Sequence, residues 1–128
     1  MIDLKTAESI HNILIDKFGG SKGIRDIGSL QAALARPYAT FDQNDLYPNS
    51  IDKASALFES IIINHPFVDG NKRISYVLMR IILLRDNLDI LASQNEKYNF
   101  VIAASKGEFR YDEIKQWLLD HIVTKNKP

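Results

Sequence analysis

The segment from residue 65 to residue 73 reads His-Pro-Phe-Val-Asp-Gly-Asn-Lys-Arg and contains the residue types that phosphate chemistry needs. Histidine titrates near neutral pH, so His65 is a candidate general base for an attacking hydroxyl group. Asp69 offers hard oxygen ligands of the kind that suit Mg²⁺. These two residues, four positions apart, predict a site for phosphate transfer.

A helix is predicted directly after this loop, over residues 71–84, because Gly70 allows a turn and a long apolar stretch follows. The first N–H groups of a helix lack intrahelical partners and lie at the positive end of its dipole, so they attract anions. Asn71, Lys72 and Arg73 lie in the first turn. We expect Gly70 and these three residues to form an anion hole for phosphate.

Pro66 and Phe67 are interpreted as structural residues of the same loop. The proline ends the preceding helix, and the aromatic ring anchors the loop to the core. Taken one by one, the residues of the loop are more typical of ordinary helix capping than of a nucleotide site. A zinc site at His65 and Asp69 is disfavoured because no third and fourth ligands are evident. The whole combination favours a nucleotide site.

The segment resembles the signature of the Fic/Doc family. The Fic branch carries His-x-Phe-x-Asp/Glu-Gly-Asn-Gly-Arg-x-x-Arg, whereas the Doc (death-on-curing) toxin branch has Asn-Lys-Arg, as here. Further similarity to the Doc branch covers most of the chain. It is found at Gly19-Gly20, Gly23-Ile24-Arg25-Asp26, Leu30, Ala33, Ala35-Arg36-Pro37, Tyr47-Pro48, Gly107-Glu108 and Trp117-Leu118.

Two departures from the Fic pattern bear on the reaction. Lys72 replaces the second glycine of the Fic signature, and Tyr76 replaces its second arginine. In the Fic branch these positions accommodate the outer phosphates of ATP for AMP transfer. In Doc toxins the lysine accompanies an inverted nucleotide and γ-phosphate transfer, so the resemblance implies a Doc-type protein kinase.

The resemblance also implies cofactors and partners. ATP and Mg²⁺ are the expected cofactors, with His65 as the base and Asp69 as the metal ligand. Translation elongation factor Tu is the expected target, and a small antitoxin the expected inhibitor. Two alternatives stay open: an AMP or other nucleotidyl transferase with the same site, and a catalytically silent interaction protein of the same fold.

A glycine-rich flap is expected at residues 19–28, as a mobile segment or a small β-hairpin. Its residues Gly20, Gly23, Ile24 and Arg25 are the candidates for binding an extended target segment by strand addition.

The cation that binds the distal phosphates is left open, with Arg25, Arg36 and Arg80 as candidates. For Arg80, an ion pair elsewhere on the helix is favoured. His11 and His121 are expected to have no site role, because they lie far from the loop along the chain. We expect no built-in inhibitor, although Ser55 to Glu59 partly matches the inhibitory element of Fic proteins.

Composition is that of an ordinary folded domain. The 128 residues include no cysteine and carry a formal net charge of zero, with a pI near 6.8. This balance excludes an electrostatic footprint for bulk nucleic acid. Neither a signal peptide nor a membrane span is recognised, so a cytoplasmic protein is expected.

Hydrophobic periodicity predicts an all-α fold: a compact single-domain bundle of about six helices over residues 1–128, with the short flap. The helix after the loop is apolar nearly all round and is expected to be the central buried one. Residues 37–48 are expected to form a loop and residues 123–128 a frayed tail. Helices are predicted over 4–18, 29–36, 50–64, 71–84, 94–106 and 111–122.

Overall fold

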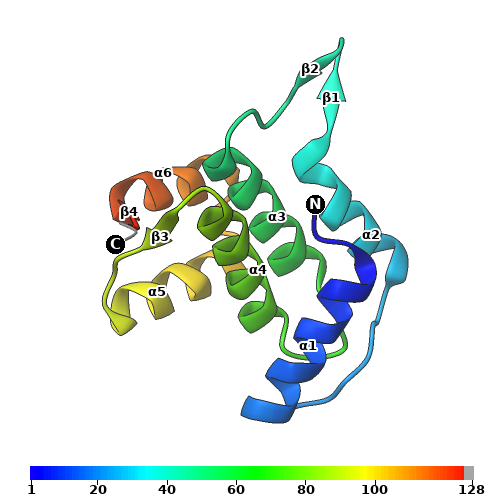
Figure 1. The fold of residues 1–128 in the computed structure, drawn as a ribbon. Coiled ribbons are helices and arrows are strands. Elements are labelled where there is room, and N and C mark those ends of the chain that lie inside the picture. The colour runs from blue at the N-terminus through cyan, green and yellow to red at the C-terminus, as the bar shows by residue number, and fades with distance from the viewer. Residues whose placement is uncertain (126–128) are drawn as a thin grey trace.

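A computed structural model of the chain describes residues 1–125, and helices make up most of this part (Figure 1). The all-α prediction is confirmed, and the helix bounds agree closely with those expected. The helices are α1 (Leu4–Phe18), α2 (Ile27–Ala35), α3 (Ser50–Asn64), α4 (Asn71–Arg85), α5 (Gln94–Ser105) and α6 (Tyr111–His121), with a 3-10 turn η1 (Arg36–Tyr38). The strands are β1 (Thr40–Phe41), β2 (Asn44–Asp45), β3 (Leu88–Ile90) and β4 (Ile122–Thr124). None of the helices described is long and apolar enough to cross a membrane.

Side-chain caps explain where the helices begin. Asp26 accepts a hydrogen bond from the N–H of Ser29 at 3.0 Å, so α2 begins at residue 27, two residues before the predicted start. Asn49 caps α3 through the N–H of Asp52 at 2.9 Å. The predicted cap, Ser50, is instead the first residue of that helix. Both corrections follow from an Asp or Asn just upstream, which satisfies the free amides of a first turn.

The centre of the bundle is formed by α3 and α4, which lie side by side (Figure 1). Helix α3 also packs against α2, α5 and α6, whereas α1 packs against α4. Eleven residues of α3 are buried, against six of α4. The central buried helix is therefore α3, and not α4 as was predicted. The reason is that α3 has neighbouring helices on more sides.

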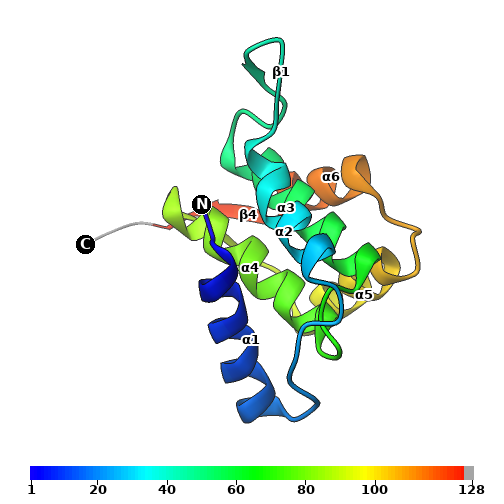
Figure 2. The same ribbon diagram turned by 90° about the vertical axis from the view of Figure 1, so that its right-hand side faces the viewer.

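Two short sheets were not predicted. Strands β1 and β2 form a hairpin that projects from the helical body (Figure 1, Figure 2), where a loop was expected. Asp42 and Gln43 at its tip have φ angles of 51° and 64°, which is the geometry of tight two-residue hairpin turns.

The second sheet pairs β3 with β4, in the register Ile90 with Ile122 and Leu88 with Thr124. The predicted fraying is thus wrong for residues 123–124, whose β-branched side chains suit a strand. Residues 126–128 of the predicted tail lie outside the described part of the chain.

The expected flap does not form a hairpin of its own. The chain from residue 19 to residue 26 contains no strand, has bends at residues 23 and 25, and contacts the loop between α3 and α4. Ile24 pairs with Phe67 as an isolated antiparallel bridge, and the N–H of Val68 donates to the carbonyl oxygen of Gly23 at 3.0 Å. The flap therefore packs against the motif loop, residues 65–70, and is hydrogen-bonded to it.

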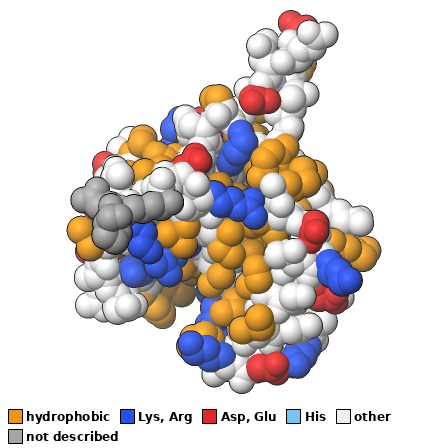
Figure 3. All heavy atoms as spheres, in the orientation of Figure 1, with side chains coloured by type: hydrophobic (Ala, Val, Ile, Leu, Met, Phe, Trp, Pro, Cys, Tyr) orange, Lys and Arg blue, Asp and Glu red, His pale blue; other side chains and the backbone are white. Residues whose placement is uncertain are grey.

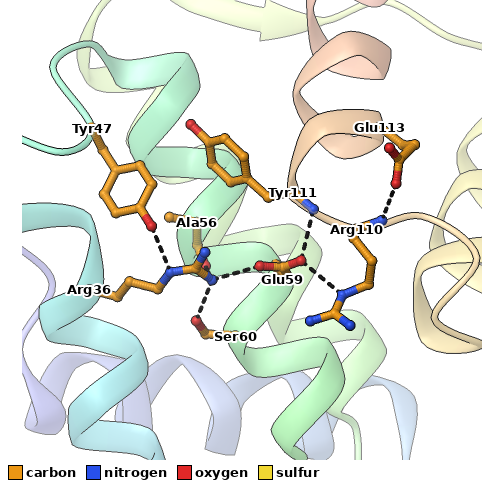
Figure 4. Close-up of polar contacts among 8 residues, drawn as sticks. All are labelled: Arg36, Tyr47, Ala56, Glu59, Ser60, Arg110, Tyr111 and Glu113. Atoms are coloured by element: carbon orange, nitrogen blue, oxygen red, sulfur yellow. Dashed lines mark hydrogen bonds and ion pairs between the residues drawn. The ribbon is translucent and has the colours of Figure 1, made fainter.

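A charge cluster around the buried Glu59 joins η1, α3 and the start of α6 (Figure 4). Glu59 is 6% exposed and accepts hydrogen bonds from Arg36 at 2.8 Å, Arg110 at 2.9 Å and the N–H of Tyr111 at 2.7 Å. Arg36 also donates to the hydroxyl of Tyr47 at 3.0 Å. Burial raises the pKa of Glu59, but the hydrogen bonds from Arg36 and Arg110 outweigh it, so the pKa lies below its ordinary value.

Candidate active site

The candidate site lies in the loop that connects α3 to α4. His65 follows the last residue of α3 with a left-handed backbone, φ 50° and ψ 59°, and its side chain is exposed. Pro66 is buried, and Phe67 is 0% exposed. Gly70, with φ 72°, precedes the first residue of α4. The loop therefore presents an imidazole to solvent while its two central residues anchor it in the core.

The side chain of Asn71 holds the loop closed. Its Oδ1 accepts from the N–H of Phe67 at 3.0 Å, and its Nδ2 donates to the carbonyl oxygen of Phe67 at 2.9 Å. We had expected this side chain to donate to a phosphate. One N–H of Nδ2 is used in this contact, so the second N–H is the donor left to this side chain for a phosphate, and the anion-hole role of Asn71 stays a prediction.

The beginning of α4 leaves backbone donors open. Within residues 1–125 the N–H groups of Asn71, Lys72 and Arg73 have no hydrogen-bond partner, and Gly70 has no side chain to cap them. The first turn carries no acidic residue. The side chains of Lys72 and Arg73 are exposed, and the guanidinium of Arg73 lies 4.5 Å from the ring centre of Phe18. Three amides and two cations thus face the same end of the helix, which suits an anion.

The carboxylate of Asp69 is exposed and held by two backbone donors. The N–H of Ser21 donates to Oδ2 at 3.1 Å, and the N–H of Gly70 donates to Oδ1 at 2.8 Å. These hydrogen bonds, from Ser21 first and then Gly70, hold the pKa of Asp69 below its ordinary value. The side chain is therefore ionised at neutral pH.

The surroundings of Asp69 fit Mg²⁺ better than a metal that needs a full protein cage. Each oxygen of the carboxylate retains a lone pair after accepting one hydrogen bond. No group of three or more His, Cys, Asp or Glu residues lies together in the described part of the chain. Mg²⁺ commonly binds through one or two carboxylates and completes its shell with phosphate oxygens and water.

The flap fastens the loop from the outside. Arg25 donates from Nε to the carbonyl oxygen of His65 at 2.7 Å and from Nη2 to that of Asn64 at 2.6 Å. Its backbone N–H donates to the carbonyl oxygen of Pro66 at 2.7 Å. A Cβ added at Gly20 would lie 2.7 Å from Oδ2 of Asp69, so this position accepts only glycine. The predicted flap residues therefore border the site.

All three candidates for the distal phosphates are engaged elsewhere. Arg25 binds loop carbonyl groups, and Arg36 binds Glu59. Arg80 forms a two-pronged ion pair with Asp89, at 2.8 and 2.9 Å, so the expected ion pair is present, but its partner lies in β3 and not on the helix. The hydrogen bond from Arg80 lowers the pKa of Asp89 to about 2.

A cleft of about 380 Å³ lies between the start of α4 and α5. Figure 3 shows a notch on the lower left between α5 and the lower end of α1, with basic side chains on its rim. Lys72, Arg73 and Tyr76 line the cleft from α4, and Lys97 and Tyr98 line it from α5. The hydroxyl oxygen of Tyr76 is buried and has no partner in the described residues, and burial raises the pKa of this phenol.

Sequence reasoning missed three residues at the site. Ser21, Lys97 and His11 all reach it from other elements, and the Nε2 atom of His11 lies 2.7 Å from the carbonyl oxygen of Asp69. The pattern held one signal for His11: it lies four residues from both Ala7 and Ile15 on the buried face of α1. A histidine on such a face needs a buried partner.

Comparison with known proteins gives two findings. The model of the Fic/DOC family matches residues 1–83, which include α1, the flap, the loop and most of α4. Toxin Doc of Mycolicibacterium smegmatis is 49% identical over 74 residues, which cover 58% of this chain and 52% of that protein. The chain thus spans about half the length of this relative. Helices α5 and α6 lie beyond the family match.

Proposed function

Because the chain belongs to the Fic/Doc family, we propose that it is a toxin of a toxin–antitoxin system that transfers the γ-phosphate of ATP to a hydroxyl group of a target protein. The observation that carries this proposal is the open beginning of α4 beside two exposed side chains, His65 and Asp69. Polar groups left without partners at a helix N-terminus favour an anionic ligand. The relative named Toxin Doc supports the toxin class.

The polyphosphate of ATP binds, in this proposal, at the amides of residues 71–73 and at Lys72. The nucleoside end extends into the cleft between α4 and α5, where the ring of Tyr98 is 66% exposed and available for stacking. The free hydroxyl of Tyr76 gains a partner there. Lys97 takes the role of the missing cation, because the three arginines considered for that role are engaged elsewhere.

His65 acts as the general base in the proposed reaction. It accepts the proton of the target hydroxyl as the new bond from that oxygen to the γ-phosphorus forms. The bond between the γ-phosphorus and the β–γ bridging oxygen breaks, and ADP leaves. Asp69 would hold Mg²⁺, which would supply charge neutralisation at the phosphate oxygens. The amides of α4 keep the phosphate chain in line for attack.

The flap offers a backbone edge for the target. Gly23 and Arg25 direct their carbonyl and N–H groups toward the loop, at residues 68 and 66. In an extended chain the intervening residue points the other way, so the N–H and C=O of Ile24 face outward. They have no partner in the described residues. We propose that an extended target segment pairs there and brings its hydroxyl to His65.

The partners of the protein are proposals as well. Translation elongation factor Tu is the proposed target, a small antitoxin the proposed inhibitor, and the cytoplasm the proposed place of action. Hydrophobic side chains gather across the middle of the face seen in Figure 3. A contiguous apolar surface is typical of protein–protein contact, and we assign it to the antitoxin.

The decisive experiment uses ATP labelled separately on its α- and γ-phosphates, with elongation factor Tu as acceptor. Label from the γ position alone is expected on the acceptor protein, and the His65→Ala variant is the negative control. Label from the α position alone would establish nucleotidyl transfer instead. Absence of both labels, with growth arrest unchanged by His65→Ala, would establish the catalytically silent alternative.

A further inference from the structure

The buried histidine of α1 makes two contacts with the motif loop. His11 is 1% exposed, and its Nε2 atom lies 2.7 Å from the carbonyl oxygen of Asp69. A carbonyl oxygen only accepts hydrogen bonds, so Nε2 carries a proton and donates it. The same ring stacks on Phe67, with ring centres 4.0 Å apart and planes inclined by 10°. One side chain of α1 thus holds the loop at two points.

The hydrogen bond from His11 determines how the next peptide group is turned. In a trans peptide the C=O and the following N–H point in opposite directions. Because His11 binds the carbonyl group of Asp69 from the core side, the N–H of Gly70 must point outward. There it donates to Oδ1 of Asp69 at 2.8 Å. The direction of the carboxylate is therefore set from inside the protein.

Volume alone does not explain a histidine at this position. Helix α1 lies close to the loop, since a Cβ added at Gly70 would be 3.6 Å from Nε2 of His11 and 3.2 Å from Cδ1 of Ile15. A phenyl ring would fill the space and stack on Phe67 as well. It would leave the carbonyl group of Asp69 without its donor, which is unfavourable in a buried place.

We infer that His11 is a positioning residue of the candidate active site. Through its Nε2–H bond to the carbonyl oxygen of Asp69, it directs the carboxylate of Asp69 and the first amides of α4 toward the bound phosphate. The kinetic consequence of this inference rests on the proposed phosphotransfer. The structural part concerns the loop alone and is measured without any substrate.

Two substitutions separate the donor from the ring. His11→Phe retains stacking on Phe67 but lacks the N–H, and it is expected to lower kcat for γ-phosphate transfer about 10- to 100-fold with little change in KM for the target protein. His11→Gln retains an N–H donor and is expected to recover most of that loss. The matched control is His121→Phe in α6, because His121 stacks on Trp117 at 4.1 Å and its Nδ1 lies 2.7 Å from the carbonyl oxygen of Trp117. This control is expected to keep the wild-type kcat.

Two measurements on the protein without nucleotide complete the test. Nitrogen NMR of histidine-labelled wild-type protein is expected to show a protonated Nε2 at His11. Amide exchange over residues 65–73 is expected to be faster in His11→Phe than in the wild type or in His121→Phe. An unprotonated Nε2, a wild-type kcat in His11→Phe, or equal losses in His11→Phe and His11→Gln would each overturn the inference.

The same design separates this inference from the proposed function. If the wild type transfers no phosphate, the proposed function fails, while the NMR and exchange measurements still decide the role of His11. If His11→Phe does not fold, the spectrum of the wild type and the exchange of His11→Gln decide it.

Discussion

The cluster around Glu59 and the loop from 65 to 73 are built from the same kinds of residue. They differ in how many of their polar groups have a hydrogen-bond partner within the protein. In the cluster, Glu59 receives three donors, and Arg36 is bound on several sides (Figure 4). In the loop, the carboxylate of Asp69 has two backbone donors, the imidazole of His65 is exposed, and three amides of α4 have no partner in residues 1–125.

The difference teaches how to separate structural from functional charges. A charge whose hydrogen-bonding capacity is met within the fold contributes to stability, because burying it unpaired would be unfavourable. A group held in place but left incomplete favours a ligand. Charge and residue type alone do not distinguish the two regions. The number of hydrogen-bond donors and acceptors that have no partner does distinguish them.

The largest effect is expected from His65→Ala in the loop. Removing the proposed general base should lower the rate of the proposed γ-phosphate transfer by about 10²- to 10⁴-fold. Denaturation by urea should show no loss of stability, because His65 is exposed and its imidazole forms no hydrogen bond or ion pair within residues 1–125. Transfer rates and unfolding curves of the purified variant measure both. A variant that transfers phosphate at the wild-type rate would show that the loop is not the catalytic centre.

The reverse pattern is expected from Glu59→Ala in the cluster. Removing one partner of a buried ion pair leaves Arg36 uncompensated and should destabilise the protein by about 3 kcal/mol. The folded fraction should still transfer phosphate at the normal rate. Urea denaturation measures the loss, with the exposed Glu8→Ala in α1 as the control. Equal stabilities of the two variants would remove the contrast between the regions.

A smaller effect is expected from Lys97→Ala in the cleft. Loss of one charged hydrogen bond to a phosphate should weaken ATP binding about tenfold. Adenosine, which carries no phosphate, should bind equally to variant and wild type. Isothermal titration of both ligands tests this, with Lys106→Ala at the end of α5 as the matched control. An unchanged affinity for ATP would exclude Lys97 from the extended site.

The smallest effect concerns the pH dependence of stability at Asp89. Like Glu59, this carboxylate has its hydrogen-bond partners within the fold. Its pKa is lowered from 3.8 to about 2 by Arg80, so the ion pair stabilises the fold above pH 3.8 and the gain is lost as pH falls toward 2. Since Arg80 is half exposed, the gain is about 1 kcal/mol after allowance for solvent screening. Asp89→Asn should therefore be less stable than the wild type at pH 7, and the gap should close between pH 4 and pH 2. A constant gap would contradict this account.

Local patterns were enough to predict the helices and the motif loop. Helical periodicity, glycine stops and polar caps act within a few residues, so the ends of α1, α3 and α4 were placed closely. Residues 40–45 escaped prediction because strands of two residues carry too little pattern. The burial of α3 depends on how many other helices pack against it. The sequence of one helix does not contain this information.

The part of the site that lies in consecutive residues was predictable from the sequence. The contacts from residues distant in sequence were not. The loop itself was found because nine consecutive residues hold it. His11 was missed because its contact with Asp69 spans 58 residues. The contacts of the Asn71 side chain with the backbone of Phe67 were not foreseen, since a side-chain amide suits a backbone group as well as a phosphate. Lys97 is set beside Lys72 only by the packing of α5 against α4.

The left-handed backbone at His65 sets the proposed catalytic role of this residue against the stability of the fold. Such a conformation is unfavourable by about 1–2 kcal/mol for any residue with a side chain. Glycine accepts it freely, so a His65→Gly protein should melt at a higher temperature than the natural one while it has lost its base. A gain in melting temperature for this variant would measure the strain that the φ angle of 50° places on a residue with a side chain at the end of α3.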